Sequence, residues 1–216
     1  MISTIIFDFD GVILESVSVK TEAFRELFSF APEHVSRIVQ YHIENGGMSR
    51  FEKFRHIYKN IIREPLTDEK CRQLSQRFSD IVEEKVAAAP FVKGAEDFLK
   101  SAFERYDFYI VSATPQNELI RIIRKRKILH YFKGVYGSPT GKSDHMAQIL
   151  LQNNLNLSEV VFVGDAVNDW EAARRNNIPF IARIRPGDKN RFTGLNNVEC
   201  TIEDFEGLGQ YLNAFG

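Results

Sequence analysis

The chain has 216 residues, of which 44% are hydrophobic and 26% are charged, and its formal net charge at pH 7 is -1. This apolar fraction is typical of a folded globular protein and excludes a largely disordered chain. The balanced charge argues against a dedicated nucleic-acid-binding surface, and no run of about 18 apolar residues exists that could span a membrane. We therefore expect a soluble, cytoplasmic protein, whose length is compatible with one domain or two.

Short apolar runs that end at turn residues recur along the chain, with helical patterns between them. The first run, Ser3–Phe7, stops at Asp8 and is typical of a buried parallel strand. Strands that alternate with helices of this length predict an α/β fold with a doubly wound parallel sheet covered on both faces. Further strands are expected at Phe108–Val111, Val135–Tyr136, Val160–Val163 and Phe180–Ile184, and helices at Gly94–Glu104, Gln116–Leu129, Ser143–Asn153 and Asn168–Asn176.

Residues 16–88 interrupt this alternation, because they contain no convincing strand. The pattern predicts a discontinuous core, formed by residues 1–15 and 89–216, with a helical insertion between the two parts. Apolar residues at helical spacing mark three stretches of the insertion, Ala23–Phe28, Phe51–Ile61 and Leu74–Val86.

Polar residues of complementary charge follow four of the predicted strands. In an open parallel sheet, ligands bind in the crevice outside the carboxyl ends of the strands, so we expect these side chains to meet at one edge. Taken singly, each has an ordinary structural role in a turn or a helix cap. Independent turn residues, however, have no reason to end four strands with complementary charges, and the combination indicates a site. The set is Asp8, Asp10, Ser112, Lys142, Asp165 and Asp169.

One lysine, one hydroxyl and four carboxylates suit magnesium-assisted phosphoryl transfer. Mg²⁺ takes oxygen ligands and usually combines one or two carboxylates with substrate phosphate and water. One carboxylate can attack phosphorus and form an aspartyl-phosphate, and another two residues away can move protons to the leaving group and from water. The lysine would offset repulsion between the carboxylates and a trianionic transition state.

Four segments resemble, in chain order, the four motifs of the haloacid dehalogenase-like superfamily, and the resemblance covers essentially the whole chain. The helical insertion resembles the C1-type cap of the phosphatase branch that includes phosphoglycolate phosphatases and β-phosphoglucomutase-like members. The resemblance implies a Rossmann-type core with an inserted helical cap. The four segments are Asp8–Ser16, Val111–Ala113, Gly141–Lys142 and Gly164–Asp169.

The resemblance also implies a role for each polar residue. Asp8 is then the nucleophile, and Asp10 is the general acid and base, which binds the metal through its backbone carbonyl. Ser112, its neighbour Ala113 and Lys142 hold the transferring phosphate. The implied Mg²⁺ ligands are Asp8, Asp10, Asp165 and Asp169, the last either directly or through water.

Within the insertion, Asn45–Arg50 is similar to the Gly-x-Ser-Arg specificity loop of β-phosphoglucomutase-like members, in which the arginine holds the non-transferring phosphate. Ser49 and Arg50 are therefore candidate substrate-binding residues. The alternative is an ordinary helix start whose first turn carries a solvated arginine. Both interpretations stay open on the sequence.

Three positions help to distinguish between the reactions that members of the superfamily carry out. Dehalogenases and phosphonate-cleaving members lack the second aspartate, which is present here as Asp10. The mutases carry a histidine where this chain has Lys20, and a cap lysine where it has Phe78. We favour a solvated helix face for Lys20 over contact with an acidic substrate group.

The basic run Arg121–Lys127 is likewise interpreted as a solvated face rather than a nucleic-acid patch.

The expected function is that of a Mg²⁺-dependent phosphatase acting on a small phosphorylated metabolite, either a sugar phosphate or a phospho-acid. The alternatives are a phosphosugar mutase and a catalytically silent binding module. The natural substrate and the oligomeric state, monomer or homodimer, stay open on the sequence.

Overall fold

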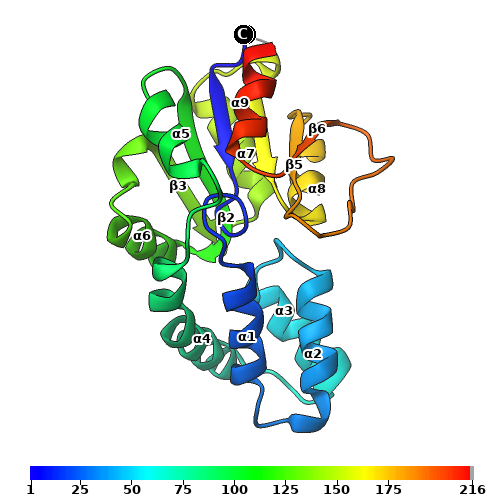
Figure 1. Cartoon of the computed structure of the whole chain (residues 1–216). Coiled ribbons are helices and arrows are strands. Elements are labelled where there is room, and N and C mark those ends of the chain that lie inside the picture. Colours follow the sequence, from blue (N-terminus) through cyan, green and yellow to red (C-terminus); the bar gives the residue numbers. More distant parts are fainter. Residues whose placement is uncertain (215–216) are drawn as a thin grey trace.

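In the computed structural model, which describes residues 1–214, six parallel strands form one sheet with helices on both faces (Figure 1). The strand order β3-β2-β1-β4-β5-β6 is doubly wound and confirms the predicted α/β fold class. The strands are β1 (Thr4–Phe7), β2 (Asp107–Pro115), β3 (Phe132–Ser138), β4 (Val160–Gly164), β5 (Phe180–Arg183) and β6 (Val198–Ile202).

The central strands are apolar throughout because both faces of the sheet are buried. In β1, Ile5 and Phe7 pack under α5, α6 and α9, whereas Ile6 packs under α7 and α8. This alternation is the two-residue period of a strand between two layers of helices. The helices of the core are α5 (Ala95–Ala102), α6 (Gln116–Lys125), α7 (Lys142–Gln152), α8 (Val167–Arg175) and α9 (Phe205–Ala214).

The sequence analysis did not predict β6 and α9. The edge strand reads Val-Glu-Cys-Thr-Ile, and Glu199 and Thr201 are exposed, so it lacks the continuous apolar run of the central strands. Gly207 and Gly209 weaken the helical pattern of α9. The predicted helix Gln116–Leu129 also ends earlier, at Lys125.

Four helices form a bundle beside the carboxyl ends of the strands, here called the cap bundle (Figure 1). Large aromatic side chains fill its centre, and they belong to the same apolar cluster as one face of the sheet. The members are α1 (Val17–Leu27), α2 (Pro32–Glu44), α3 (Arg50–His56), which continues as a π-helical turn (Ile57–Ile62), and α4 (Asp68–Ala88).

Two adjacent segments connect the cap bundle to the sheet. The N–H of Glu15 donates to the carbonyl of Pro90 at 2.9 Å, and the N–H of Val92 donates to the carbonyl of Ile13 at 3.0 Å. Arg183 of β5 contacts both Glu15 carboxylate oxygens, at 3.1 and 2.5 Å. The outgoing and returning chains are therefore held together at one point of the sheet edge.

Among the helices of residues 1–214, none combines the length and the apolar content that crossing a bilayer requires.

Candidate active site

Three aspartates converge at the carboxyl end of the sheet. Asp8 directly follows β1, Asp165 follows β4, and Asp169 lies in the first turn of α8, with one oxygen of each within 4.8 Å of the others. Asp8 and Asp169 are only 3% and 0% exposed. The loop after β1 passes so close to Asp165 that a Cβ on Gly11 (φ +80°) would lie 2.2 Å from a carboxylate oxygen. Only glycine fits there, because both the backbone angle and the space exclude a side chain.

Lys142, at the start of α7, supplies a positive charge within this group. Its ammonium lies 2.7 Å from Asp8 Oδ1 and 2.5 Å from Asp169 Oδ1. Burial alone would lower the pKa of Lys142, but the carboxylates of Asp169 and Asp8 raise it, so the side chain stays charged. The other oxygen of Asp169 accepts the N–H groups of Asp165 at 3.2 Å and Ala166 at 3.1 Å, which fixes the loop after β4.

The three carboxylates carry more negative charge than one lysine can balance. Burial, together with the charges of Asp169 and Asp10, raises the pKa of Asp8 to about 7 despite Lys142. Burial and the charges of Asp8 and Asp169 also raise the pKa of Asp165. All the donors are hard carboxylate oxygens, which are the ligands that Mg²⁺ and similar divalent cations prefer. The donor set and its surplus negative charge therefore fit a divalent metal.

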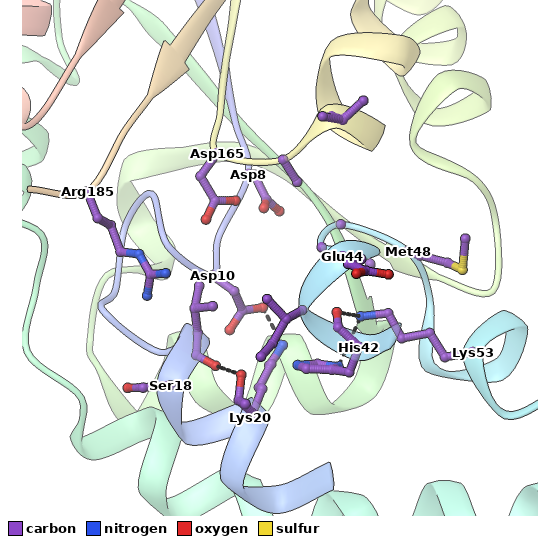
Figure 2. A pocket seen from close by; sticks show the side chains of 18 of the residues that line it. Asp8, Asp10, Ser18, Lys20, His42, Glu44, Met48, Lys53, Asp165 and Arg185 are labelled. Atoms are coloured by element: carbon purple, nitrogen blue, oxygen red, sulfur yellow. Dashed lines mark hydrogen bonds and ion pairs between the residues drawn. The ribbon is translucent and has the colours of Figure 1, made fainter. Parts of the chain in front are cut away.

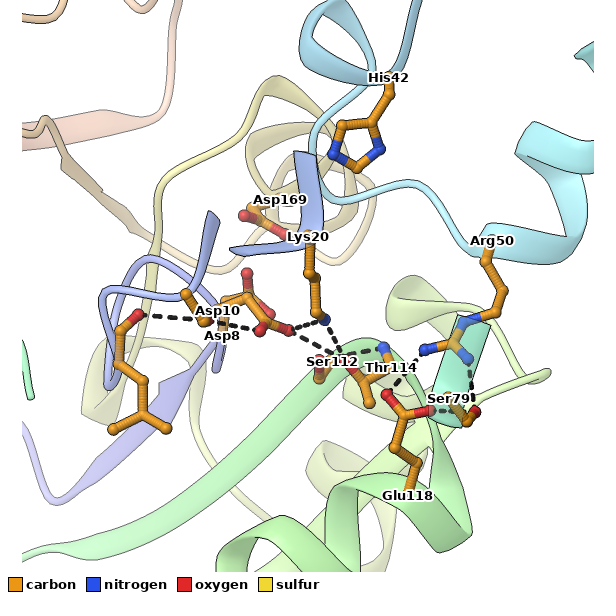
Figure 3. A network of polar contacts seen from close by, with 12 residues as sticks. Asp8, Asp10, Lys20, His42, Arg50, Ser79, Ser112, Thr114, Glu118 and Asp169 are labelled. Atoms are coloured by element: carbon orange, nitrogen blue, oxygen red, sulfur yellow. Dashed lines mark hydrogen bonds and ion pairs between the residues drawn. The ribbon is translucent and has the colours of Figure 1, made fainter. Parts of the chain in front are cut away.

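Asp10 lies apart from this cluster and has its own partners (Figure 3). It accepts hydrogen bonds from Ser16 Oγ at 2.6 Å and Thr114 Oγ1 at 2.9 Å, and it forms an ion pair with Lys20. Burial opposes ionisation of Asp10. The charge of Lys20 and the hydrogen bonds from Lys20, Ser16 and Thr114 outweigh it and lower the pKa of Asp10. Asp10 is thus held as a carboxylate.

Lys20 of α1 reaches across from the cap bundle to the sheet edge. Besides its ion pair with Asp10, it donates to Thr114 Oγ1 at 2.6 Å, and its side chain is only 15% exposed. The expectation of a solvated helix face for Lys20 was wrong. Sequence periodicity placed it on a polar helix face but carried no information that this face meets the end of β2.

A cavity of about 390 Å³ lies between the sheet edge and the cap bundle (Figure 2). Ser112, which is 1% exposed, ends the continuous buried run of β2 and accepts the N–H of Thr114 at 3.2 Å. The lining includes, from the sheet side, Asp8, Asp10, Ser112, Ala113, Lys142 and Asp165, from the cap side, Lys20, Glu22, His42, Glu44, Arg50, Lys53 and Phe78, and, from the segment after β5, Arg185, Asp188, Lys189 and Arg191.

Ser49 and Arg50, the two candidate substrate-binding residues, contact mainly the start of α3 and residues of α4 and α6. Ser49 caps α3: its Oγ accepts the N–H of Glu52 at 3.3 Å, and the Glu52 carboxylate accepts the N–H of Ser49 at the same distance. Ser49 borders a second hollow that also reaches Ser112 and Lys142.

Arg50 is buried and tied to the core (Figure 3). It donates to Glu118 of α6 at 2.7 Å, to Ser79 Oγ at 2.7 Å and to the carbonyl of Ser75 at 3.2 Å. The guanidinium lies 4.5 Å from the centre of the Phe78 ring. Its charge is therefore already balanced by Glu118 of α6, a helix that packs on the sheet.

The basic run Arg121–Lys127 contacts the cap bundle as well as solvent. Arg121 donates to Glu83 of α4 at 2.8 and 2.9 Å, and Lys125 contacts Glu84 at 2.5 Å. Helix α6 thus contacts the cap bundle in two ways. Exposed ion pairs join it to α4, and the buried ion pair between Glu118 and Arg50 joins it to α3.

The buried ion pair between Arg50 and Glu118 should contribute more to the free energy of unfolding than the exposed ion pairs do. Replacing Glu118 with alanine should lower the free energy of unfolding by about 3 kcal/mol, because it leaves the Arg50 guanidinium buried without its counter-charge. Replacing Glu84, whose ion pair with Lys125 is exposed, should leave that free energy almost unchanged. Urea unfolding followed by circular dichroism measures both, and equal losses in the two variants would contradict the prediction.

Known proteins resemble this chain over most of its length. A model of the haloacid dehalogenase-like hydrolase family matches residues 5–183. A phosphorylated carbohydrates phosphatase of Thermotoga maritima is 27% identical over 184 residues, which cover 81% of each chain. Solved structures of similar fold include a hydrolase from Pseudomonas syringae (TM-score 0.78, 20% identity, 98% of each chain). Another is a haloacid dehalogenase-like family hydrolase from Streptococcus pneumoniae (TM-score 0.73, 20% identity, 98% of each chain).

Proposed function

Since the chain belongs to the haloacid dehalogenase-like hydrolase family, we propose that it is a Mg²⁺-dependent phosphatase that hydrolyses a small phosphorylated metabolite. The observation that carries the proposal is the position of Asp8, which lies among Asp165, Asp169 and Lys142 and lines the cavity between the sheet edge and the cap bundle. The Thermotoga relative, whose name is that of a phosphatase for phosphorylated carbohydrates, supports a sugar phosphate or a related phospho-acid as substrate.

In the first step, an Asp8 oxygen bonds to phosphorus while the ester bond between phosphorus and the leaving oxygen breaks. Asp10, which takes up a proton from water when the bound substrate loosens its ion pair with Lys20, gives that proton to the leaving oxygen, and the products are an alcohol and an aspartyl-phosphate on Asp8. In the second step, water bonds to phosphorus, the bond to Asp8 breaks, and Asp10 accepts the proton of the water. Inorganic phosphate leaves, and both aspartates return to their starting state.

The other residues of the site hold charge and position. Mg²⁺, held by Asp8, Asp165, Asp169 and the backbone carbonyl of Asp10, would offset the negative charge of the phosphate and the carboxylates. Lys142 stabilises the transferring phosphoryl group from the other side, and Ser112 with the N–H of Ala113 orients its oxygens. The ion pair with Lys20 holds Asp10 as a carboxylate, so substrate binding must loosen that pair for Asp10 to take up the proton that it gives in the first step.

We assign catalysis and enclosure of the substrate to two different parts of the chain. We propose residues 1–15 and 89–216 as the catalytic core and residues 16–88 as the cap. Closing the cap bundle over the cavity would exclude bulk water and bring Lys20, Arg50 and their neighbours around the substrate.

Metal removal tests the proposal directly. Purified protein with Mg²⁺ is expected to release phosphate from members of a panel of small phosphomonoesters, and excess EDTA should lower the rate at least about 100-fold. Added Mg²⁺ should restore the rate, while EDTA that has first been saturated with Mg²⁺ should have no effect. Phosphate release that persists in EDTA would contradict metal dependence. Product formed without free phosphate, dependent on a bisphosphate activator, would instead indicate a mutase.

A further inference from the structure

Lys53 of α3 is a buried lysine that borders the proposed substrate cavity. Its side chain is 4% exposed, and its ammonium lies 3.1 Å from His42 Nδ1 and 3.3 Å from the His42 carbonyl (Figure 2). Within residues 1–214, no carboxylate forms an ion pair with it. Buried lysines are usually paired with an acidic group. The cavity therefore contains a desolvated cation whose counter-charge the described residues do not supply.

The surroundings of Lys53 connect it to the catalytic groups. Burial and the charges of Lys20 and Lys142 lower its pKa to about 7, while the carboxylates of Asp10 and Asp165 act in the opposite direction. These surroundings disfavour the charged form of Lys53. An anion bound beside its side chain would favour the charged form.

His42 is suited to orient the ammonium but not to neutralise it. Its ring stacks on Phe24, with centroids 4.1 Å apart, and burial together with the charges of Lys53 and Lys20 lowers its pKa to about 2. The ring is therefore neutral and can accept a hydrogen bond from the lysine through Nδ1. A second ammonium proton points to the His42 carbonyl, which leaves the third available to an acceptor in the cavity.

The other cations on the cap side are already committed. Arg50 is paired with Glu118, and Lys20 with Asp10. Phe78 is apolar. Lys53 thus differs from the rest of the cap-side lining in carrying a buried positive charge together with an open place for an anion.

We propose that Lys53, oriented by His42, binds an acidic group at the end of the substrate remote from the transferred phosphate, while Arg50 positions α3 against the core. This inference rests on the proposed phosphatase function and deepens it. It narrows the substrate class to phosphomonoesters that carry a second anionic group, either a carboxylate or another phosphate. A cavity of about 390 Å³ accommodates a molecule of this kind.

Two matched substrate pairs test the inference. 3-Phosphoglycerate differs from glycerol 3-phosphate by a carboxylate at the far end, and fructose 1,6-bisphosphate differs from fructose 6-phosphate by a second phosphate. The wild-type protein is expected to prefer the acidic member of at least one pair by about 10-fold or more in kcat/KM. Preference, in both pairs, for the member without the second anionic group, or equal kcat/KM within both pairs, would overturn the inference and leave the phosphatase proposal standing.

Substitution assigns any preference to the residue. Lys53→Met keeps length and apolar volume and removes the charge, so kcat/KM for the ester with the second anionic group should fall at least about 30-fold. The kcat/KM for its partner without that group should fall by no more than about threefold. Lys59→Met, at an exposed lysine six residues on, should change neither. A purely structural role for Lys53 would lower the melting temperature and reduce both activities equally. Our proposal instead expects an unchanged or higher melting temperature, because a desolvated charge is lost.

Binding without turnover separates this inference from the proposed function. In an Asp8→Asn background, 3-phosphoglycerate and fructose 1,6-bisphosphate with Mg²⁺ should raise the melting temperature, and adding Lys53→Met should abolish the shift for the bound ester. If no ester is hydrolysed by the wild-type protein but this shift appears, the phosphatase proposal fails and the anion site stands. If neither ester shifts the melting temperature, the anion site fails.

Discussion

Replacing Asp8 with asparagine is expected to reduce phosphate release from small phosphomonoesters by at least about 10,000-fold. The amide has almost the same shape but cannot attack phosphorus, so the covalent step is lost while the cavity stays intact. Release of inorganic phosphate under saturating Mg²⁺ measures the effect. Asp97→Asn, at an exposed position of α5, is the matched control and should retain full activity. Activity that survives in the Asp8 variant would contradict the assignment of the nucleophile.

The same variant gives a check that needs no turnover. In metal-free protein the pKa of Asp8 is about 7, against an ordinary value of 3.8. The folded state therefore holds a proton more tightly than the unfolded state, and the stability that this proton contributes is lost as the pH rises from about 4 to about 7. Because asparagine is neutral at every pH, the melting temperature of the wild-type protein should fall relative to that of the variant over this range. Parallel melting curves across the range would contradict the environment described for Asp8.

The second large effect is expected at Lys142. Replacing it with methionine should lower kcat/KM at least about 100-fold, since the transferring phosphoryl group loses its nearest protein cation. In EDTA at pH 8, the free energy of unfolding should also fall by about 3 kcal/mol, because Asp8, Asp165 and Asp169 lose the cation buried among them.

The pH dependence and a control distinguish this from a general loss of packing. At pH 5 Asp8, whose pKa is about 7, is protonated and needs less counter-charge, and the raised pKa of Asp165 acts in the same direction, so the stability loss in the Lys142 variant should be smaller than at pH 8. Lys133→Met, which removes an exposed pairing with Asp107, should change neither activity nor stability appreciably. A stability loss that is equal at both pH values would point to packing alone.

The sequence predicted the sheet and the place where its polar residues meet, because both depend on local patterns and one general rule. Apolar runs such as Val160–Val163 identify buried strands, and parallel strands carry their carboxyl ends to the same edge. Asp8, Asp165 and Asp169 could therefore be placed together without knowledge of any contact. The edge strand β6 was missed because it is buried on fewer sides and its pattern is mixed.

The cap residues could not be predicted in the same way, because their roles depend on which element faces each helix. Arg50 and Glu118 are 68 positions apart, and nothing near either residue indicates the ion pair. The position of Lys20 in the site depends on its contact with Thr114 of β2, which is distant in the sequence. Lys53 lies only three residues beyond Arg50, and its burial next to His42 follows from the packing of α3 on α2, which helical periodicity alone does not specify.

The joined segments at Glu15 and Pro90 bear on how such proteins diversify. The chain leaves the sheet and returns to it at neighbouring positions, linked by a backbone hydrogen bond of 2.9 Å, so the whole cap bundle occupies a single loop of the core. A different bundle with the same spacing between its ends can fill that loop without changing the order of the strands. Remodelling or exchanging this one inserted unit would therefore change the cap side of the cavity, while the order of the strands and the aspartates at the sheet edge stay in place.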